Sequence, residues 1–428
     1  MTNVINLTPK IETKQLERND FDQKISLFSK VFYHPLFRPY FRLAFLMIVL
    51  NAYIFLNADQ TAAQVQNLIL LNFGVGIFIR QQWVINLLFK MATSAPKSWP
   101  IKVRWALGKV YHFGGIHIGG YIAGTFWLGY FLTQSMNQGL TSLNVLLAVH
   151  LLVLMAVMIV SLPQIRFPKH NLFEIVARFG NWTSILLFWA ECFVQEGAIF
   201  SANKVVLSYL TFCVALPWFR LKRVHVEINS PSDHAALAKF DHGETPFAGS
   251  STELSTNPLF EWHSFANIPV PGEKGFRLTI SRAGDWTGRL IDQKPKKLWV
   301  KGITTAGVGN VELIFKKVVW VATGSGIGPC LPHLLDVKVP SKLVWSTRDP
   351  RKTYGDELVD KIMDSNPDAL IWDTTANGKP DLVKLAYHAF KEFEAEAVIV
   401  ISNQKVTFHV NYELEQRGIP AFGAIWDS

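Results

Sequence analysis

The chain has 428 residues, a formal net charge of +9 and 49% hydrophobic residues, with a mean hydropathy of +0.19. This apolar content is too high for an ordinary soluble protein, so part of the chain is expected to lie in lipid, and the length predicts two or three domains. No run of basic residues is interleaved with aromatic residues, which argues against nucleic acid as a partner. The three cysteines show no C-x-x-C spacing, which argues against a disulfide framework, an iron–sulfur cluster or a structural zinc site.

Residues 1–40 are predicted to form a cytoplasmic arm. The first twenty residues are polar and of mixed charge, so no cleavable signal peptide is expected. The arm ends in VFYHPLFRPYFR, whose prolines and aromatic residues suit an approach to the membrane interface.

Six apolar segments follow, each long enough to cross a hydrocarbon core of roughly 30 Å. They cover residues 42–57, 65–89, 105–133, 142–162, 181–199 and 203–219. Basic residues concentrate in the intervals after the second, fourth and sixth segments, whereas the other intervals hold a single basic residue among them. The positive-inside rule therefore predicts a protein of the plasma (inner) membrane with both termini in the cytoplasm, and the lipid bilayer as a partner.

Four polar side chains inside these segments need an explanation, because such groups are costly in hydrocarbon. His117 and His150 are expected at matched depth, where they would either ligate one haem b or each bond a group on a neighbouring helix. Arg80 and Glu191 are also expected at matched depth, as an ion pair between helices or as a site for a lipid or quinone headgroup.

Beyond Val224 the pattern changes to short alternating strands broken by Gly, Pro and Ser, which is typical of a small antiparallel barrel. Residues 230–258, rich in Ser, Thr, Pro and Ala, are predicted to form a long loop or lid. The strands are VHVEIN, EWHSFANIPV, FRLTISRAGDWTGRLI, KLWVKGI and NVELIF.

The stretch KKVVWVATGSGIGPCLPHLL, residues 316–335, predicts a strand, a glycine-rich loop and a helix. Glycines at 324, 326 and 328 let a diphosphate approach the backbone N–H groups at the positive end of the helix dipole. A tight turn without a ligand is the alternative interpretation. Strands and helices alternate from there to the C-terminus, which predicts a doubly wound parallel sheet.

Three motifs in this order carry a family resemblance. The loop with Pro329, T-G-x-G-x-x-P, resembles the nicotinamide loop of the ferredoxin-NADP reductase superfamily. EWHSFANIP and ISRAGDWTGRL resemble the H-P-F-T and I-R-x-x-G-D-W-T-x-x-L segments of NADPH oxidases and ferric reductases, although Ser264 and Ala266 replace a proline and a threonine, and the arginine is shifted by one place. In the membrane half, GGIHIGG and HNLFEIVARFGNW look closest to the TmpA-type integral membrane flavoproteins. The oxidases' paired histidines four turns apart are missing, so two haems are not expected.

The resemblance implies an FAD site and a nicotinamide site. The residues it implies along the isoalloxazine and ribityl chain are His263, Phe265 and Asn267; those at the flavin diphosphate are Arg282, Trp286, Thr287, Gly302, Thr304 and Thr305. Those at the nicotinamide nucleotide are Gly324, Gly326, Gly328 and Pro329, with Ser346, Arg348, Lys352 and Tyr354 at the 2′-phosphate of NADPH. The last set favours NADPH over NADH. Residues expected near the reacting atoms are Thr323, Asn403 and the terminal aromatic Trp426.

The predicted architecture is an α-helical membrane bundle of six transmembrane helices (41–220), an antiparallel β-barrel that binds FAD (221–312) and an α/β doubly wound NAD(P)-binding domain (313–428). The predicted function is a membrane-bound, ferric reductase-like oxidoreductase that takes electrons from cytosolic NAD(P)H. Its acceptor, a ferric chelate, a quinone or a partner oxygenase, is not identified by the sequence. The alternative is a flavin-binding regulatory or scaffold protein with slow turnover.

Overall fold

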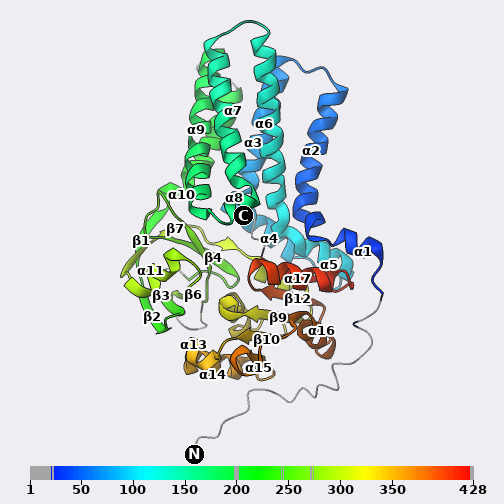
Figure 1. Ribbon diagram of the computed structural model, residues 1–428, viewed down its shortest axis with the longest axis vertical. Coiled ribbons are helices and arrows are strands. Elements are labelled where there is room, and N and C mark those ends of the chain that lie inside the picture. Colours follow the sequence, from blue (N-terminus) through cyan, green and yellow to red (C-terminus); the bar gives the residue numbers. More distant parts are fainter. Residues whose placement is uncertain are drawn as a thin grey trace, which may run out of the picture.

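The computed structural model describes residues 21, 24–196, 202–241, 243, 245–269, 272 and 274–424. A bundle of long helices stands above two smaller domains, a β-rich one and an α/β one, which lie side by side beneath it (Figure 1). The bundle consists of α2 (Pro39–Asn57), α3 (Ala62–Ile79), α6 (Gly114–Met136), α7 (Ser142–Ser161), α9 (His170–Glu196) and α10 (Ala202–Phe219).

The bundle differs from the prediction in two respects. Three of the described helices, α2, α3 and α7, are by length and composition apolar enough to cross a membrane, and α10 contributes a shorter apolar stretch. The second and third predicted spans have the wrong bounds, because α3 ends at Ile79 and α6 begins only at Gly114. The apolar residues in between form α4 (Gln82–Thr93), α5 (Ile101–Gly108) and the short helix η3 (Lys109–Phe113), which pack at the base of the bundle.

Small residues bring α6 close to its neighbours, as the GGIHIGG stretch predicted. A Cβ atom on Gly115 would lie 2.0 Å from the carbonyl oxygen of Tyr40 in α2, and one on Gly120 would lie 2.7 Å from that of Asn72 in α3. Only glycine permits this backbone contact. The side chain of Asn72 is in turn paired with Asn51 of α2 by hydrogen bonds of 2.8 and 3.0 Å.

The β-rich domain is a small antiparallel barrel, as predicted. Its strands are β1 (Leu221–His225), β2 (Glu227–Ser232), β3 (Ala235–Phe240), β4 (Ser250–Ser255), β5 (His263–Ala266), β6 (Phe276–Ser281), β7 (Lys297–Lys301) and β8 (Thr305–Ala306). One sheet has the order β1-β7-β4-β5 and the other β2-β3-β6, and a bridge between Ile268 and Arg277 joins them. The predicted loop at 230–258 is wrong, since it contains β3 and β4, and part of the predicted strand after Ser281 is the helix α11 (Asp285–Gln293).

The α/β domain confirms the doubly wound prediction. Its sheet is parallel throughout, with the order β11-β10-β9-β12-β13. The strands are β9 (Val318–Thr323), β10 (Ser341–Thr347), β11 (Leu370–Asp373), β12 (Ala397–Ile401) and β13 (Ala421–Gly423), and the main helices are α12 (Ile327–Leu335), α14 (Asp356–Ser365), α16 (Leu382–Glu392) and α17 (Gln404–Glu415). The strand order reverses between β9 and β12, which is where such sheets bind ligands.

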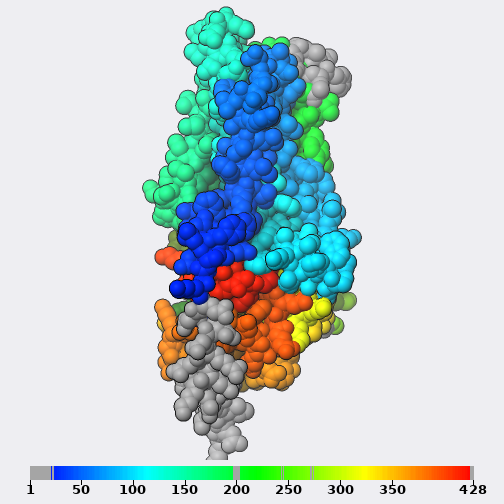
Figure 2. Space-filling view, turned by 90° about the vertical axis from the view of Figure 1, so that its right-hand side faces the viewer, coloured from blue at the N-terminus to red at the C-terminus, as the bar shows by residue number. Residues whose placement is uncertain are grey.

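The α/β domain is fixed to the base of the bundle by buried charge. The guanidinium of Arg104 on α5 contacts the Glu396 carboxylate at 2.7 and 3.2 Å and donates to the Ile314 carbonyl at 2.9 Å. Lys109 pairs with Glu415 and donates to the carbonyl of Ala421 at 2.6 Å. Figure 2 shows the result from one side, where the blue and cyan segments of the N-terminal half rest directly on the red C-terminal segment.

Candidate functional site

The glycine-rich loop lies at the point where the strand order reverses. Thr323 ends β9, and Gly324 follows with a φ of +51°, in the left-handed region that favours glycine. A Cβ on Gly326 would lie 2.1 Å from the carbonyl oxygen of Ile401 in β12, so the loop can pass this strand only with glycine there. The loop leads into the N-terminus of α12, whose dipole favours a negatively charged ligand.

The same loop faces the barrel. A Cβ on Gly328 would lie 3.2 Å from the Cβ of Thr279 in β6, so the start of α12 is in contact with the flavin-type barrel predicted from the sequence. Pro329 occupies the first turn of α12, where the missing N–H group disturbs no helical hydrogen bond. A ligand held by this loop therefore lies between the two domains.

The predicted residues near the reacting atoms are only partly brought together. The hydroxyl groups of Thr323 and Ser402 are hydrogen-bonded at 2.5 Å across the reversal point, and Ser402 was not among the predicted site residues. The exposed side chain of Asn403 caps α17 by accepting from the backbone N–H of Val406 at 3.1 Å. Trp426 lies outside the described residues, and its predicted position beside the flavin stays a prediction.

The four residues predicted for a 2′-phosphate lie at the carboxyl edge of β10 and on the short helix α13 (Pro350–Tyr354), but they divide into two pairs. Arg348 and Lys352 are exposed, whereas Ser346 and Tyr354 are buried. Burial raises the pKa of the Tyr354 hydroxyl, which therefore stays protonated. Of these four residues, only the two cations are placed to meet a phosphate from solvent.

A cavity of about 390 Å³ opens at the mouth of the barrel. Its lining includes Gly302 and Thr304, two of the predicted flavin contacts. A Cβ on Gly302 would lie 2.7 Å from the carbonyl oxygen of Arg220, which explains the glycine. The other lining residues are Thr245, Pro246, Phe247, Thr252, Phe276, Val300 and Lys301.

Beside the cavity lies an aromatic cluster. The ring of His263 stacks on Trp286 at 4.2 Å between centroids, and Phe265 stacks on the same indole at 5.8 Å. Trp286 is buried, so it supports these rings from the barrel core and does not present a surface to a diphosphate. Burial, partly opposed by nearby carboxylates, lowers the pKa of His263, which favours the neutral imidazole. Phe265 is the cross-strand partner of Thr252, which places the cluster directly beside the cavity.

Several buried polar atoms in and next to β4 and β5 lack a hydrogen-bond partner within the described part of the chain. They are Thr252 Oγ1, Ser255 Oγ, His263 Nε2 and Asn267 Oδ1. Such atoms are unusual in folded proteins unless a ligand or water supplies the partner. A flavin, with ring carbonyls, ring nitrogens and ribityl hydroxyls, has the polar groups that these atoms need. The residues present therefore fit the implied FAD.

The predicted diphosphate residues at α11 are occupied by protein partners. The Arg282 guanidinium contacts the Asp292 carboxylate at 3.1 and 2.5 Å and donates to the carbonyl of Asp233 at 2.7 Å. The Thr287 hydroxyl accepts from the N–H of Gly284 at 3.1 Å. Arg282 is exposed to solvent together with Asp292, so a diphosphate would have to compete with this ion pair.

A second residue at the site, besides Ser402, was not predicted from the sequence. Asn86 on α4 donates from Nδ2 to the carbonyl of Thr304 at 3.0 Å and accepts at Oδ1 from the N–H of Ala306 at 2.8 Å. Its amide thus pairs with the segment 302–306 as a neighbouring strand would. Hydropathy places Asn86 in a membrane span, and no local pattern points to this contact.

Of the two alternatives predicted for His117 and His150, the structure shows a bond from each to a neighbouring helix, and it does not bring the two rings together as axial ligands of one haem. His117 lies in the first turn of α6, where its Nδ1 is 3.1 Å from the carbonyl oxygen of Gly76. His150 lies near the middle of α7, where its Nδ1 is 2.8 Å from the Glu191 carboxylate. At about 1.5 Å per residue, the two histidines differ in depth by about 12 Å, too much for the axial ligands of one haem. Among the described residues, no group of three or more His, Cys, Asp and Glu could hold a metal ion.

The predicted ion pair between Arg80 and Glu191 is also wrong. Arg80 caps the inner end of α3, whereas Glu191 lies toward the outer end of α9 and pairs with His150. Both depth predictions failed because they counted from span ends that the structure places elsewhere.

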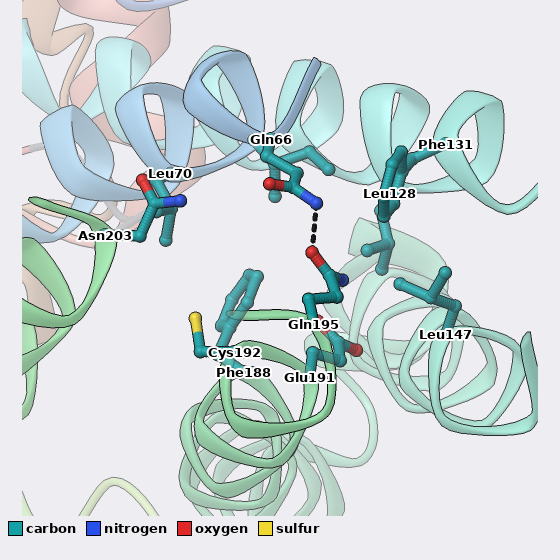
Figure 3. A pocket seen from close by; sticks show the side chains of 11 residues that line it. Gln66, Leu70, Leu128, Phe131, Leu147, Phe188, Glu191, Cys192, Gln195 and Asn203 are labelled. Atoms are coloured by element: carbon teal, nitrogen blue, oxygen red, sulfur yellow. Dashed lines mark hydrogen bonds between the residues drawn. The ribbon is translucent and has the colours of Figure 1, made fainter. Parts of the chain in front are cut away.

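A small cavity of about 30 Å³ lies beside Glu191 in the outer half of the bundle, where Gln66 of α3 donates to Gln195 of α9 (Figure 3). It has room for about one water molecule, not for a haem or a quinone ring.

Comparison with known proteins gives related sequences and distant folds. Residues 308–428 match the model of the C-terminal domain of "Adenylate-forming reductase 03009". Over 417 residues, 92% of this chain, it is 40% identical to adenylate-forming reductase 03009, and it is 39% identical to adenylate-forming reductase 06235, both from Coprinopsis cinerea. The chain spans only 41% of the length of each of these relatives.

Two solved structures show a more remote likeness. A Neisseria gonorrhoeae ferredoxin NADP+ reductase with bound FAD and NADP has a TM-score of 0.39 and 13% sequence identity. The alignment covers 48% of this chain and 98% of the reductase chain. A Malassezia yamatoensis flavohemoglobin with bound FAD and heme has a TM-score of 0.42 and 13% sequence identity. That alignment covers 94% of this chain and 100% of the flavohemoglobin chain. At TM-scores this low, neither likeness bears on function. The sequence relatives are the firmer result, and residues 308–428 are similar to the C-terminal domain of an adenylate-forming reductase.

Proposed function

We propose that this protein is a membrane-bound oxidoreductase that passes electrons from cytosolic NAD(P)H through FAD to an acceptor at the membrane. The observation that carries the proposal is the contact of the glycine loop with the barrel, at Gly328 and Thr279. A nicotinamide nucleotide held by that loop would face the barrel, whose unpaired polar atoms at β4 and β5 are suited to a ligand. More specifically, we propose a ferric reductase-like protein that resembles the TmpA-type integral membrane flavoproteins.

The membrane location is supported by the surface of the bundle. Large apolar side chains are exposed along its helices, where water would make them unfavourable. Examples are Phe45, Leu56, Leu71, Leu152, Leu186 and Phe212. We propose that all six bundle helices cross the membrane, that both termini and the two lower domains are cytoplasmic, and that the acceptor is a ferric chelate, a quinone or a partner oxygenase.

When bound, FAD supplies the chemistry, because it accepts a hydride and releases electrons one at a time. The chain's own residues bind and orient. Thr252 and Asn267 offer hydrogen-bonding atoms to the flavin, and the glycine loop offers backbone N–H groups to the nucleotide diphosphate. Arg348 and Lys352 would hold the 2′-phosphate of NADPH, for which a planar guanidinium is well suited.

The test is to purify the whole chain in detergent, record its absorption spectrum and follow NADPH and NADH oxidation with an artificial acceptor. We expect flavin bands, steady-state oxidation and a preference for NADPH. Flavin without turnover would instead support the regulatory or scaffold role. A protein without flavin would refute both. Because His117 and His150 lie at different depths, no Soret band that depends on both is expected, and two haems per chain would contradict the assignment.

A second candidate function comes from the sequence relatives. Because the chain is 40% identical to part of an adenylate-forming reductase, it would act in the reduction of an adenylate. NADPH consumption that requires an added acyl adenylate, with no artificial acceptor present, would favour this function over reduction of a membrane acceptor.

A further inference from the structure

A stripe of exposed apolar residues runs along α4. Trp83, Leu87 and Met91 are 41%, 48% and 63% exposed, and their spacing of four residues places them on one face of the helix. The opposite face is buried against the lower domains, with Phe89 in the core and Asn86 bonded to the segment 302–306. Helix α4 therefore has two apolar faces, and the described part of the chain covers only one of them.

The elements next to α4 repeat this pattern. The short helices α1 (Leu27–Phe32) and η2 (Pro35–Phe37) come just before α2, and α5 lies between α4 and the start of α6. We call α1, η2, α4 and α5 the interface collar. Figure 1 shows it between the bundle and the lower domains. Its exposed apolar residues outside α4 include Leu27, Phe28, Leu36, Phe37, Ile101 and Val103.

Chain connectivity fixes the level of the collar. Only Arg80 and Gln81 separate the end of α3 from the start of α4, and only Arg38 separates η2 from α2. If α2 and α3 cross the membrane, the collar must begin where they leave the hydrocarbon. That is the headgroup level, where amphipathic helices with Trp and Phe settle.

The charge of the collar identifies the partner. The sequences 24–58 and 80–113 contain ten Lys and Arg residues and no Asp or Glu. Arg104 and Lys109 are used in contacts with the α/β domain, whereas Lys30 on α1, Lys90 on α4 and Lys102 on α5 are exposed. A surface that is apolar, aromatic and basic matches an anionic phospholipid leaflet better than it matches a protein partner or a second copy of itself, which would carry the same charge.

We propose that the interface collar lies in the headgroup region of the cytoplasmic leaflet and binds anionic phospholipid there. The inference rests on the membrane location proposed above. Because Asn86 is on the protein-facing side of α4, lipid contact on the opposite side also positions the segment that carries Gly302 and Thr304.

The test uses spin labels on the full chain in nanodiscs, with Cys192 replaced by Ser. Collision with oxygen reports lipid exposure, and collision with nickel-EDDA reports water. The test site is Leu87→Cys on α4. Leu152→Cys on α7 is the control for exposure to lipid, and Val337→Cys on the α/β domain is the control for exposure to water. All three side chains are exposed in the structure. We expect Leu87→Cys to resemble Leu152→Cys.

The controls separate the two proposals. If Leu87→Cys resembles Val337→Cys while Leu152→Cys stays lipid-exposed, the collar inference is overturned and the membrane location stands. If Leu152→Cys is also water-exposed, the membrane location itself has failed.

A second measurement tests the lipid class. Spin-labelled phosphatidylserine is expected to be immobilised by the protein several-fold more than phosphatidylcholine. The double variant Lys90→Gln/Lys102→Gln should lose most of this preference, and Lys379→Gln, an exposed lysine of the α/β domain, should keep it. Equal immobilisation of the two lipids by the unaltered protein would refute the anionic specificity.

Discussion

Asn86 offers the sharpest test of how the base of the bundle controls the flavin site. Asn86→Ala removes the donor to the Thr304 carbonyl at 3.0 Å and the acceptor for the Ala306 N–H at 2.8 Å. Leaving a buried backbone group unpaired costs about 1–3 kcal/mol, and both groups here are only partly buried, so we expect about 2 kcal/mol in total. FAD must then order the segment 302–306 on binding, and this cost corresponds to a loss of at most roughly 30-fold in affinity for FAD, since every 1.4 kcal/mol is tenfold.

The assay is titration of flavin-depleted protein with FAD, followed by the quenching of flavin fluorescence. Asn86→Asp should be at least as weak, because its carboxylate keeps the acceptor but faces the Thr304 carbonyl without a donor. The matched control is Asn57→Ala at the end of α2, where the side chain donates only to the carbonyl of Tyr53, and it should bind FAD normally. Unchanged FAD affinity in a folded Asn86→Ala protein would refute the reasoning.

Four further predictions concern the α/β domain and its contact with the base of the bundle. Gly326→Ala should abolish NAD(P)H oxidation and lower the melting temperature, because the new Cβ would lie 2.1 Å from the carbonyl oxygen of Ile401. The FAD absorbance of the barrel should remain. Full activity would contradict the assignment of the loop. Arg348→Ala should weaken NADPH binding by about 2 kcal/mol and leave NADH nearly unchanged, as measured by Michaelis constants. Arg104→Met should destabilise the protein by about 3 kcal/mol in urea unfolding, because the Glu396 carboxylate loses its ion-pair partner and keeps only the hydrogen bond from the backbone N–H of Lys316. Burial raises the pKa of Glu396, but hydrogen bonds from Arg104 and the backbone outweigh burial, and the net pKa is lowered. The stabilisation that this carboxylate gives at neutral pH should therefore be lost as the pH falls through the lowered pKa. A free energy of unfolding that does not change with pH in this range would contradict the prediction.

Local patterns in the sequence were sufficient for the fold class of the two lower domains, but not for β3, β4 and α11. Alternating short strands predicted the antiparallel barrel, and the strand, glycine loop and helix around Gly324 predicted the start of the doubly wound sheet. These predictions succeeded because hydrophobic periodicity, turn residues and glycines determine the backbone conformation of the few residues around them. The helix α11 was missed because DWTGRLI follows directly on a true strand.

Only the tertiary structure decided the bounds of the bundle helices. Hydropathy cannot distinguish an apolar segment that crosses the bilayer from one that lies along it, and so α4 was predicted to be the end of a span. The depths of His117, His150, Arg80 and Glu191 depended on those bounds, which is why both predicted pairs failed.

The site itself shows the same division. The sequence by itself determined the glycine loop for which we propose a nucleotide, because glycines and a helix start are local features. It did not determine that Asn86 would hold Thr304, a residue 218 positions away, or that Ser402 would meet Thr323. Such contacts exist only once α4 lies under the bundle and β12 lies beside β9, and these placements follow from the burial of whole faces, not from any residue's immediate neighbours.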